Sequence, residues 1–94
     1  MEFVEEKQPR NHFEKQAVVV YWLEKIASMQ EGITVDHVNT CYVTAKWKRP
    51  ARFEANLSLT AARKGWIDTS DGSNIRITVS GEDFVVHDLP TTAG

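Results

Sequence analysis

Apolar residues recur at helical intervals in the first third of the chain. Asn11, a favourable N-cap residue, stands just before this run. Intervals of three and four residues describe one face of a helix, so we predict a first helix over residues 12–28. Around residues 17–23 nearly every face is apolar, which is typical of a helix buried on more than one side. The apolar positions of the repeat are Phe13, Ala17, Val20, Leu23 and Ala27.

A second helix is predicted after a brief extended segment at residues 33–34. Gly32 is suited to the left-handed residue that closes the first helix. Thr34 can cap the next helix, which we expect to run from Val35 to about Ala45. Its apolar residues share one face and predict its buried side; they are Val38, Cys41, Tyr42 and Ala45.

The third predicted helix begins at Pro50, because proline suits the first turn of a helix and disfavours helix in the residue before it. Phe53, Leu57 and Ala61 are four residues apart and should face inward. Gly65 is placed to end this helix.

Two short strands are predicted next, over residues 66–70 and 75–79. The residues between them, 71–74, have the composition of a turn, in which Gly72 can take a positive φ. Ser80 is expected to cap a last short helix. A hairpin of this size is not stable alone, so we expect it to pack on the helices. The residues expected in that contact are Trp66, Ile67, Ile77 and Val79.

Composition indicates a soluble domain of 94 residues, with 41% apolar and 26% charged residues. We predict a flexible arm over residues 1–10, a domain over residues 11–88 and a disordered tail over residues 89–94. No apolar run approaches the roughly 18 residues that span a bilayer. The start lacks the basic region of a signal peptide, and a lone cysteine, Cys41, suits a reducing compartment. We therefore expect a cytoplasmic protein without a membrane partner, with Cys41 as a small buried apolar residue.

The order of the predicted elements resembles the winged helix-turn-helix domain of bacterial transcription regulators. Those proteins have a third helix that ends in a basic pair, a glycine and two apolar residues, as in Arg63-Lys64-Gly65-Trp66-Ile67. After the wing they have a strand and a short helix that open as in residues 77–84, ITVSGEDF. The resemblance implies an α+β fold: a three-helix core, a two-stranded wing and a short C-terminal helix.

The resemblance also implies binding of double-stranded DNA in transcription regulation, with the third helix in the major groove and the wing on the backbone. Residues 37–80 hold seven basic and three acidic residues, against an overall net charge of −2. Arg52 and Asn56 have side chains that pair guanine and adenine edges. The DNA-binding residues that the resemblance implies are Lys46, Lys48, Arg49, Arg52, Asn56, Arg63, Asn74 and Arg76.

Other residues favour a protein partner instead. Ala55 and Leu59 lie on the face of the third helix that should read bases, and Asp68 and Asp71 in the wing would repel phosphate. The alternative is a winged helix that binds another protein, or a second copy of itself, without DNA. Such an interface would use Tyr21, Trp22 and Leu59.

No catalytic or metal-binding pattern is evident. His12, His37 and His87 lie far apart in sequence and, with Cys41, have no metal-ligand spacing. The glycines are accounted for by a helix end, a turn and a helix start. We therefore expect neither an enzyme nor a cofactor or metal.

Overall fold

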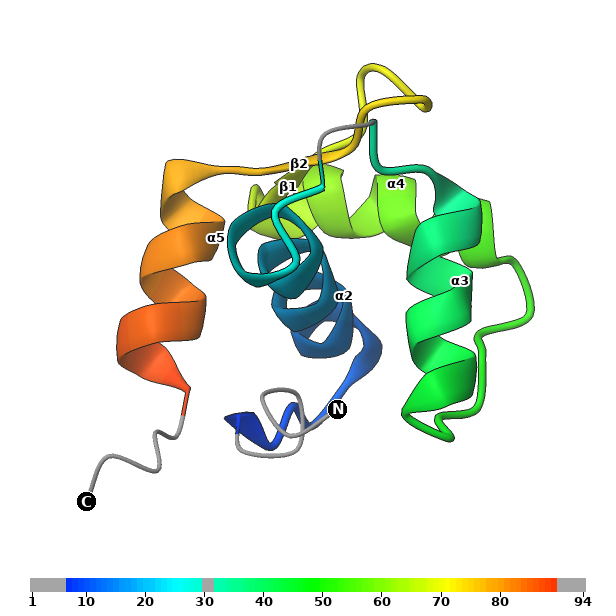
Figure 1. The fold of residues 1–94 in the computed structure, drawn as a ribbon, viewed down its shortest axis with the longest axis horizontal. Helices are drawn as coiled ribbons and strands as arrows, with labels where there is room; N and C mark the ends of the chain where they lie inside the picture. The colour runs from blue at the N-terminus through cyan, green and yellow to red at the C-terminus, as the bar shows by residue number, and fades with distance from the viewer. Residues whose placement is uncertain (1–6, 30–31, 90–94) are drawn as a thin grey trace.

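Helix α2 lies at the centre of the fold, with α5 on one side of it and α3 on the other, in the computed structural model (Figure 1), which describes residues 7–29 and 32–89. A two-stranded antiparallel sheet and α4 complete this α+β arrangement. The elements are α2 (His12–Tyr21), η1 (Trp22–Ile26), α3 (Val35–Thr44), α4 (Phe53–Lys64), β1 (Ile67–Asp68), β2 (Arg76–Ile77), α5 (Val79–Asp83) and η2 (Phe84–Asp88).

The first helix begins as predicted, because Asn11 Oδ1 accepts a hydrogen bond from the Glu14 N–H at 3.0 Å. It continues from α2 into the π-helical turn η1. The prediction that Gly32 ends it in a left-handed conformation is wrong: Ser28 has the positive φ, 51°. Gly32 instead allows two segments to approach, since a Cβ there would lie 1.9 Å from the Ser73 carbonyl oxygen.

Helix α3 agrees with the prediction. The Thr34 side chain accepts from the His37 backbone N–H, and the Thr34 N–H donates to His37 Nδ1 at 3.0 Å. This reciprocal capping box satisfies two backbone donors at the helix start. Val38, Cys41 and Tyr42 are buried, which confirms that one face of the helix is its core face and that Cys41 is a buried apolar residue.

Helix α4 begins at Phe53, so the predicted start at Pro50 is wrong. Arg52 has φ −121° and ψ 80°, which is not helical. The rings of Trp47 and Phe53 both pack edge-on against Tyr42, with centroids 5.3 and 4.9 Å away. These contacts hold the preceding segment on α3, so the chain turns before it becomes helical. Gly65 ends α4 in the left-handed conformation, φ 66°, as predicted.

The strands are shorter than predicted: Ile67 pairs with Ile77 and Asp68 with Arg76. Ile33 forms an isolated antiparallel bridge with Ile75 beside them, which confirms the brief extended segment. Gly72 has no positive φ.

The last helix begins earlier than predicted. Thr78, and not Ser80, caps α5 by accepting from the Gly81 N–H at 3.0 Å. Because this cap starts the helix at Val79, that residue leaves the strand and is 77% exposed. The prediction that Val79 packs the hairpin against the helices is therefore wrong.

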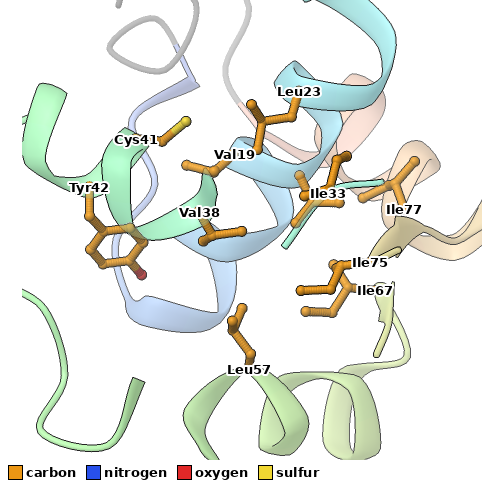
Figure 2. Packing of buried hydrophobic residues seen from close by; sticks show 11 residues of the cluster. Val19, Leu23, Ile33, Val38, Cys41, Tyr42, Leu57, Ile67, Ile75 and Ile77 are labelled. Carbon is orange, nitrogen blue, oxygen red and sulfur yellow. The ribbon is translucent and has the colours of Figure 1, made fainter. Parts of the chain in front are cut away.

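The main core joins α2, α3, α4 and the sheet (Figure 2). Leu57 projects from α4 toward Ile67 and Ile75 of the hairpin, and Val38 projects from α3. A second buried cluster, on the α5–η2 side, contains Ala17, Val18, Val85 and Leu89. Leu89 is therefore packed, and the predicted disordered tail does not begin there. The predicted tail at residues 90–94 and the predicted arm at residues 1–6 lie outside the described residues, whereas Lys7 is buried.

Candidate nucleic-acid interface

Exposed basic residues lie just before helix α4 in the sequence and in its last turn. Residues 46–52, which we call the basic loop, join α3 to α4 and contain Lys46, Lys48, Arg49 and Arg52. Arg63 lies in the last turn of α4, and all five side chains are exposed. Within the described residues none of the five forms an ion pair with a carboxylate. Arg49 donates to Asn39 Oδ1 at 2.8 Å, which leaves its charge uncompensated.

The ion pairs among the described residues involve other basic residues. Arg10 pairs with Glu14 at 3.3 Å, Lys25 with Glu82 at 3.8 Å, and Arg76 with Glu24 at 2.7 Å. The five basic residues near α4 therefore differ from Arg10, Lys25 and Arg76. They are exposed and, within the described residues, have no acidic partner.

The outward side of α4 is formed by small or apolar residues. We call Ala55, Ser58, Leu59 and Ala62 the outer face of α4; all four are exposed. Leu57 faces the core as predicted, with Phe53 and Ala61 partly buried beside it. A shallow depression at one edge of the outer face is lined by Pro50, Ala51, Arg52, Ala55, Asn56 and Leu59. The outer face itself carries no charged side chain, and the charged residues Arg52, Glu54 and Arg63 lie near it.

Asn56 lies differently from the prediction. It is half-buried, and its Oδ1 accepts from Gln16 Nε2 of α2 at 2.5 Å. Thr60 is fully buried and donates to Gln16 Oε1. Residues 56 and 60 are about one helical turn apart, so Gln16 forms hydrogen bonds with two successive turns of α4. The sequence contains only an indirect signal for this network, because Gln16 directly precedes the stretch 17–23 that we predicted to be buried on more than one side.

The hairpin offers less positive charge than predicted. Arg76 is held by Glu24, while Asn74 is exposed in the turn, its N–H bonded to the Asp71 carbonyl at 3.0 Å. Hydrogen bonds from the Ser70 hydroxyl and N–H lower the pKa of Asp68, and Ser73 lowers that of Asp71 in the same way. The hairpin tip therefore keeps two carboxylates ionised at neutral pH.

The aromatic residues near the interface serve in packing. Lys15 Nζ lies 5.3 Å from the centre of the Trp47 ring, on which Tyr42 also packs. Tyr21 and Trp22 are half-buried against the cores. Lys64 lies over Trp66, 5.5 Å from the ring centre, so it is tied to the protein surface more closely than Arg63.

Potential metal ligands, the cysteine thiol and the length of the helices are three further features of the part of the chain that the structure describes. No group of three His, Cys, Asp or Glu side chains there could hold a metal ion. Burial raises the pKa of the Cys41 thiol, which keeps it protonated and unreactive. None of the helices within residues 7–29 and 32–89 is long and apolar enough to cross a membrane.

No protein-family model, no curated protein and no solved structure matches this chain. Function is therefore inferred from the residues of the interface itself.

Proposed function

We propose that the chain is a winged helix-turn-helix domain that binds double-stranded DNA, with α4 in the major groove and the basic loop on the phosphate backbone. The observation that carries this proposal is the group of exposed lysine and arginine residues near α4, none of which has an acidic partner among the described residues. Lys46, Lys48, Arg49 and Arg52 precede the helix and Arg63 lies near its end. Phosphates are the partner that such an arrangement suits best.

The element order supports the winged-helix part of the proposal. The extended segment at Ile33 forms an isolated bridge with Ile75, next to the two-stranded sheet, and α3 and α4 lie between these segments in the sequence. Gly65 turns the chain from α4 into the hairpin. The paired strands are only two residues each, shorter than the wing we expected.

Charge favours contact through α4 more than through the hairpin tip. The hairpin carries Asp68 in β1 and Asp71 in its turn, and its basic residue, Arg76, is already paired with Glu24. The basic loop has no comparable acid, although Glu54 lies in the first turn of α4. DNA bound to this surface would therefore meet the loop and the outer face of α4 first, with Asn74 as the exposed polar group of the turn.

The test is a titration of mixed-sequence duplex DNA at two salt concentrations. Neutralising about five phosphates predicts that affinity falls roughly 500-fold between about 50 and 200 mM salt. Arg49→Glu combined with Arg52→Glu should weaken binding at least about tenfold at the lower salt and flatten the salt dependence. The control, Arg10→Glu combined with Lys25→Glu, changes net charge equally outside the basic loop. Absence of binding at low salt, or equal losses in both double variants, would reject the proposal.

The apolar outer face of α4 supports a second candidate function, binding of another protein. Leu59 is 38% exposed and Ala55 lies beside it in the depression at the edge of the helix. In this alternative no DNA is bound, and either a protein partner or a second copy covers α4. Sedimentation and pull-down of wild type and Leu59→Asp test it: a strict monomer removes self-association, and capture unaffected by Leu59→Asp removes the version that uses α4.

A further inference from the structure

The buried amide of Gln16 determines which atom of Asn56 faces outward. Gln16 is fully buried in α2 and contacts α4 through both ends of its amide. Its Nε2 donates to Asn56 Oδ1 at 2.5 Å, and its Oε1 lies beside the Thr60 hydroxyl, which is also 3.0 Å from the Asn56 backbone carbonyl oxygen. A donor there requires an acceptor opposite, so Asn56 turns its oxygen inward.

The amide nitrogen of Asn56 is consequently the end that remains for a ligand. Its Nδ2 has no hydrogen-bond partner among the described residues, yet no buried side-chain nitrogen or oxygen there lacks one. Nδ2 is therefore accessible to solvent. Asn56 also lines the depression with Ala55 and Leu59, so the donor lies at the edge of an apolar patch on α4.

A side-chain amide recognises adenine by using both ends, donating to N7 and accepting from the N6 amino group. In this protein the Asn56 oxygen is turned inward, toward Nε2 of the fully buried Gln16, and away from the surface that a base would approach. Only the donating half of that recognition remains. The acceptor that it matches in the major groove is N7, which adenine and guanine share.

We propose that Gln16 acts as a positioning residue that restricts Asn56 to donating, so that Asn56 contacts purine N7 without distinguishing adenine from guanine. This inference rests on the proposed DNA binding. It also changes the expectation that Asn56 selects adenine. Ala55 and Leu59 are apolar neighbours that suit a base edge, while Arg52 in the same lining supplies the charge that suits phosphate.

The test compares one duplex with its counterpart in which every purine is a 7-deazapurine, so that N7 is replaced by C–H. The full chain is titrated with both at low salt. Loss of a single hydrogen bond should weaken wild-type binding on the order of fivefold. In the Asn56→Asp variant the inward oxygen still accepts from Gln16, but the outward donor is gone, so the ratio of the two affinities should fall well below the wild-type ratio.

Asn39→Asp is the matched control, because Asn39 Oδ1 accepts from Arg49 and the same amide-to-carboxylate change retains an acceptor. Each protein is compared with itself on two duplexes, so the added negative charge cancels. Asn39→Asp should keep the wild-type ratio. Gln16→Met, which releases the Asn56 amide, should lower the ratio although it leaves Asn56 in place.

Side-chain amide exchange in the wild type checks the orientation without a substitution. The Gln16 Nε2 protons should be protected from exchange, whereas the Asn56 Nδ2 protons should exchange freely and become protected on adding DNA. Equal wild-type affinity for both duplexes, or protected Asn56 protons in the free protein, would overturn the inference while leaving DNA binding intact. Absence of binding to either duplex would instead reject the proposed function, and the inference with it.

Discussion

Arg76 Nε donates to Glu24 Oε1 at 2.7 Å, which joins the second strand of the hairpin to the first helix across 52 positions of sequence. Lys25 adds to this contact, because its ammonium lies 3.5 Å from Glu24 and 3.8 Å from Glu82 of α5. The hairpin, η1 and α5 are thus linked by one small group of charges. Arg76, which we predicted from the sequence to bind DNA, therefore forms an ion pair within the protein.

Arg76→Gln should have little effect on DNA affinity, compared with Arg52→Gln, because Arg76 is already paired. It should lower the free energy of unfolding by less than about 1 kcal/mol, since the Arg76 side chain is mostly exposed. Urea denaturation and duplex titration measure the two effects. If Arg76→Gln weakened DNA binding as much as Arg52→Gln, the hairpin would contact DNA directly.

Gly32→Ala should be strongly destabilising, by more than about 2 kcal/mol, because the new methyl group would lie 1.9 Å from the Ser73 carbonyl oxygen. Gly72→Ala is the control. No atom lies within 4 Å of the position of its Cβ and its φ is not positive, so it should be neutral or stabilise by up to about 1 kcal/mol. Thermal and urea denaturation compare them; equal stabilities would show that the turn can move away from Gly32.

Two leucines of α4 should respond oppositely. Leu57→Ala removes a buried side chain from the main core and should cost about 2–5 kcal/mol of stability. Leu59→Ala changes an exposed residue and should alter stability by no more than about 0.5 kcal/mol. Leu59→Ala should nevertheless lower the affinity for a partner that binds the outer face of α4. A large loss of stability in Leu59→Ala would mean that Leu59 is a core residue.

Acid should destabilise the fold through His12. Burial, and next the charge of Lys15, lower the pKa of His12, whose Nδ1 lies 3.2 Å from the Tyr42 hydroxyl. Below the ordinary pKa of 6.5 the unfolded chain binds a proton that the folded chain does not, so stability falls with pH until the lower folded pKa is passed.

The difference between wild type and His12→Gln isolates this contribution, because every other titrating group is present in both proteins. Urea denaturation at about pH 7 and pH 5 should show that wild type loses more stability than His12→Gln. Equal losses in the two proteins would assign the acid sensitivity to other groups.

Features that depend on neighbours along the chain were predictable from sequence. Asn11 and Thr34 cap their helices through residues three positions later, and Gly65 adopts the left-handed conformation that ends α4. The apolar spacing also identified the α+β order and the inward position of Leu57. In each case the physical cause, a local hydrogen bond or a repeat of 3.6 residues, lies within a few positions of the residue concerned.

Features that depend on distant partners were decided by the tertiary structure. Arg76 meets Glu24, Gly32 meets Ser73, and Asn56 meets Gln16 forty positions away. Each residue had a plausible local role: a DNA contact, a helix end and a base reader. Packing of α2 against α4 and the hairpin brings the partners within hydrogen-bond or steric range, and helical or strand periodicity does not specify which polar groups meet across such a contact. Sequence therefore predicted where the third helix lies and which side of it faces inward, and tertiary structure decided which of its polar atoms form hydrogen bonds within the protein.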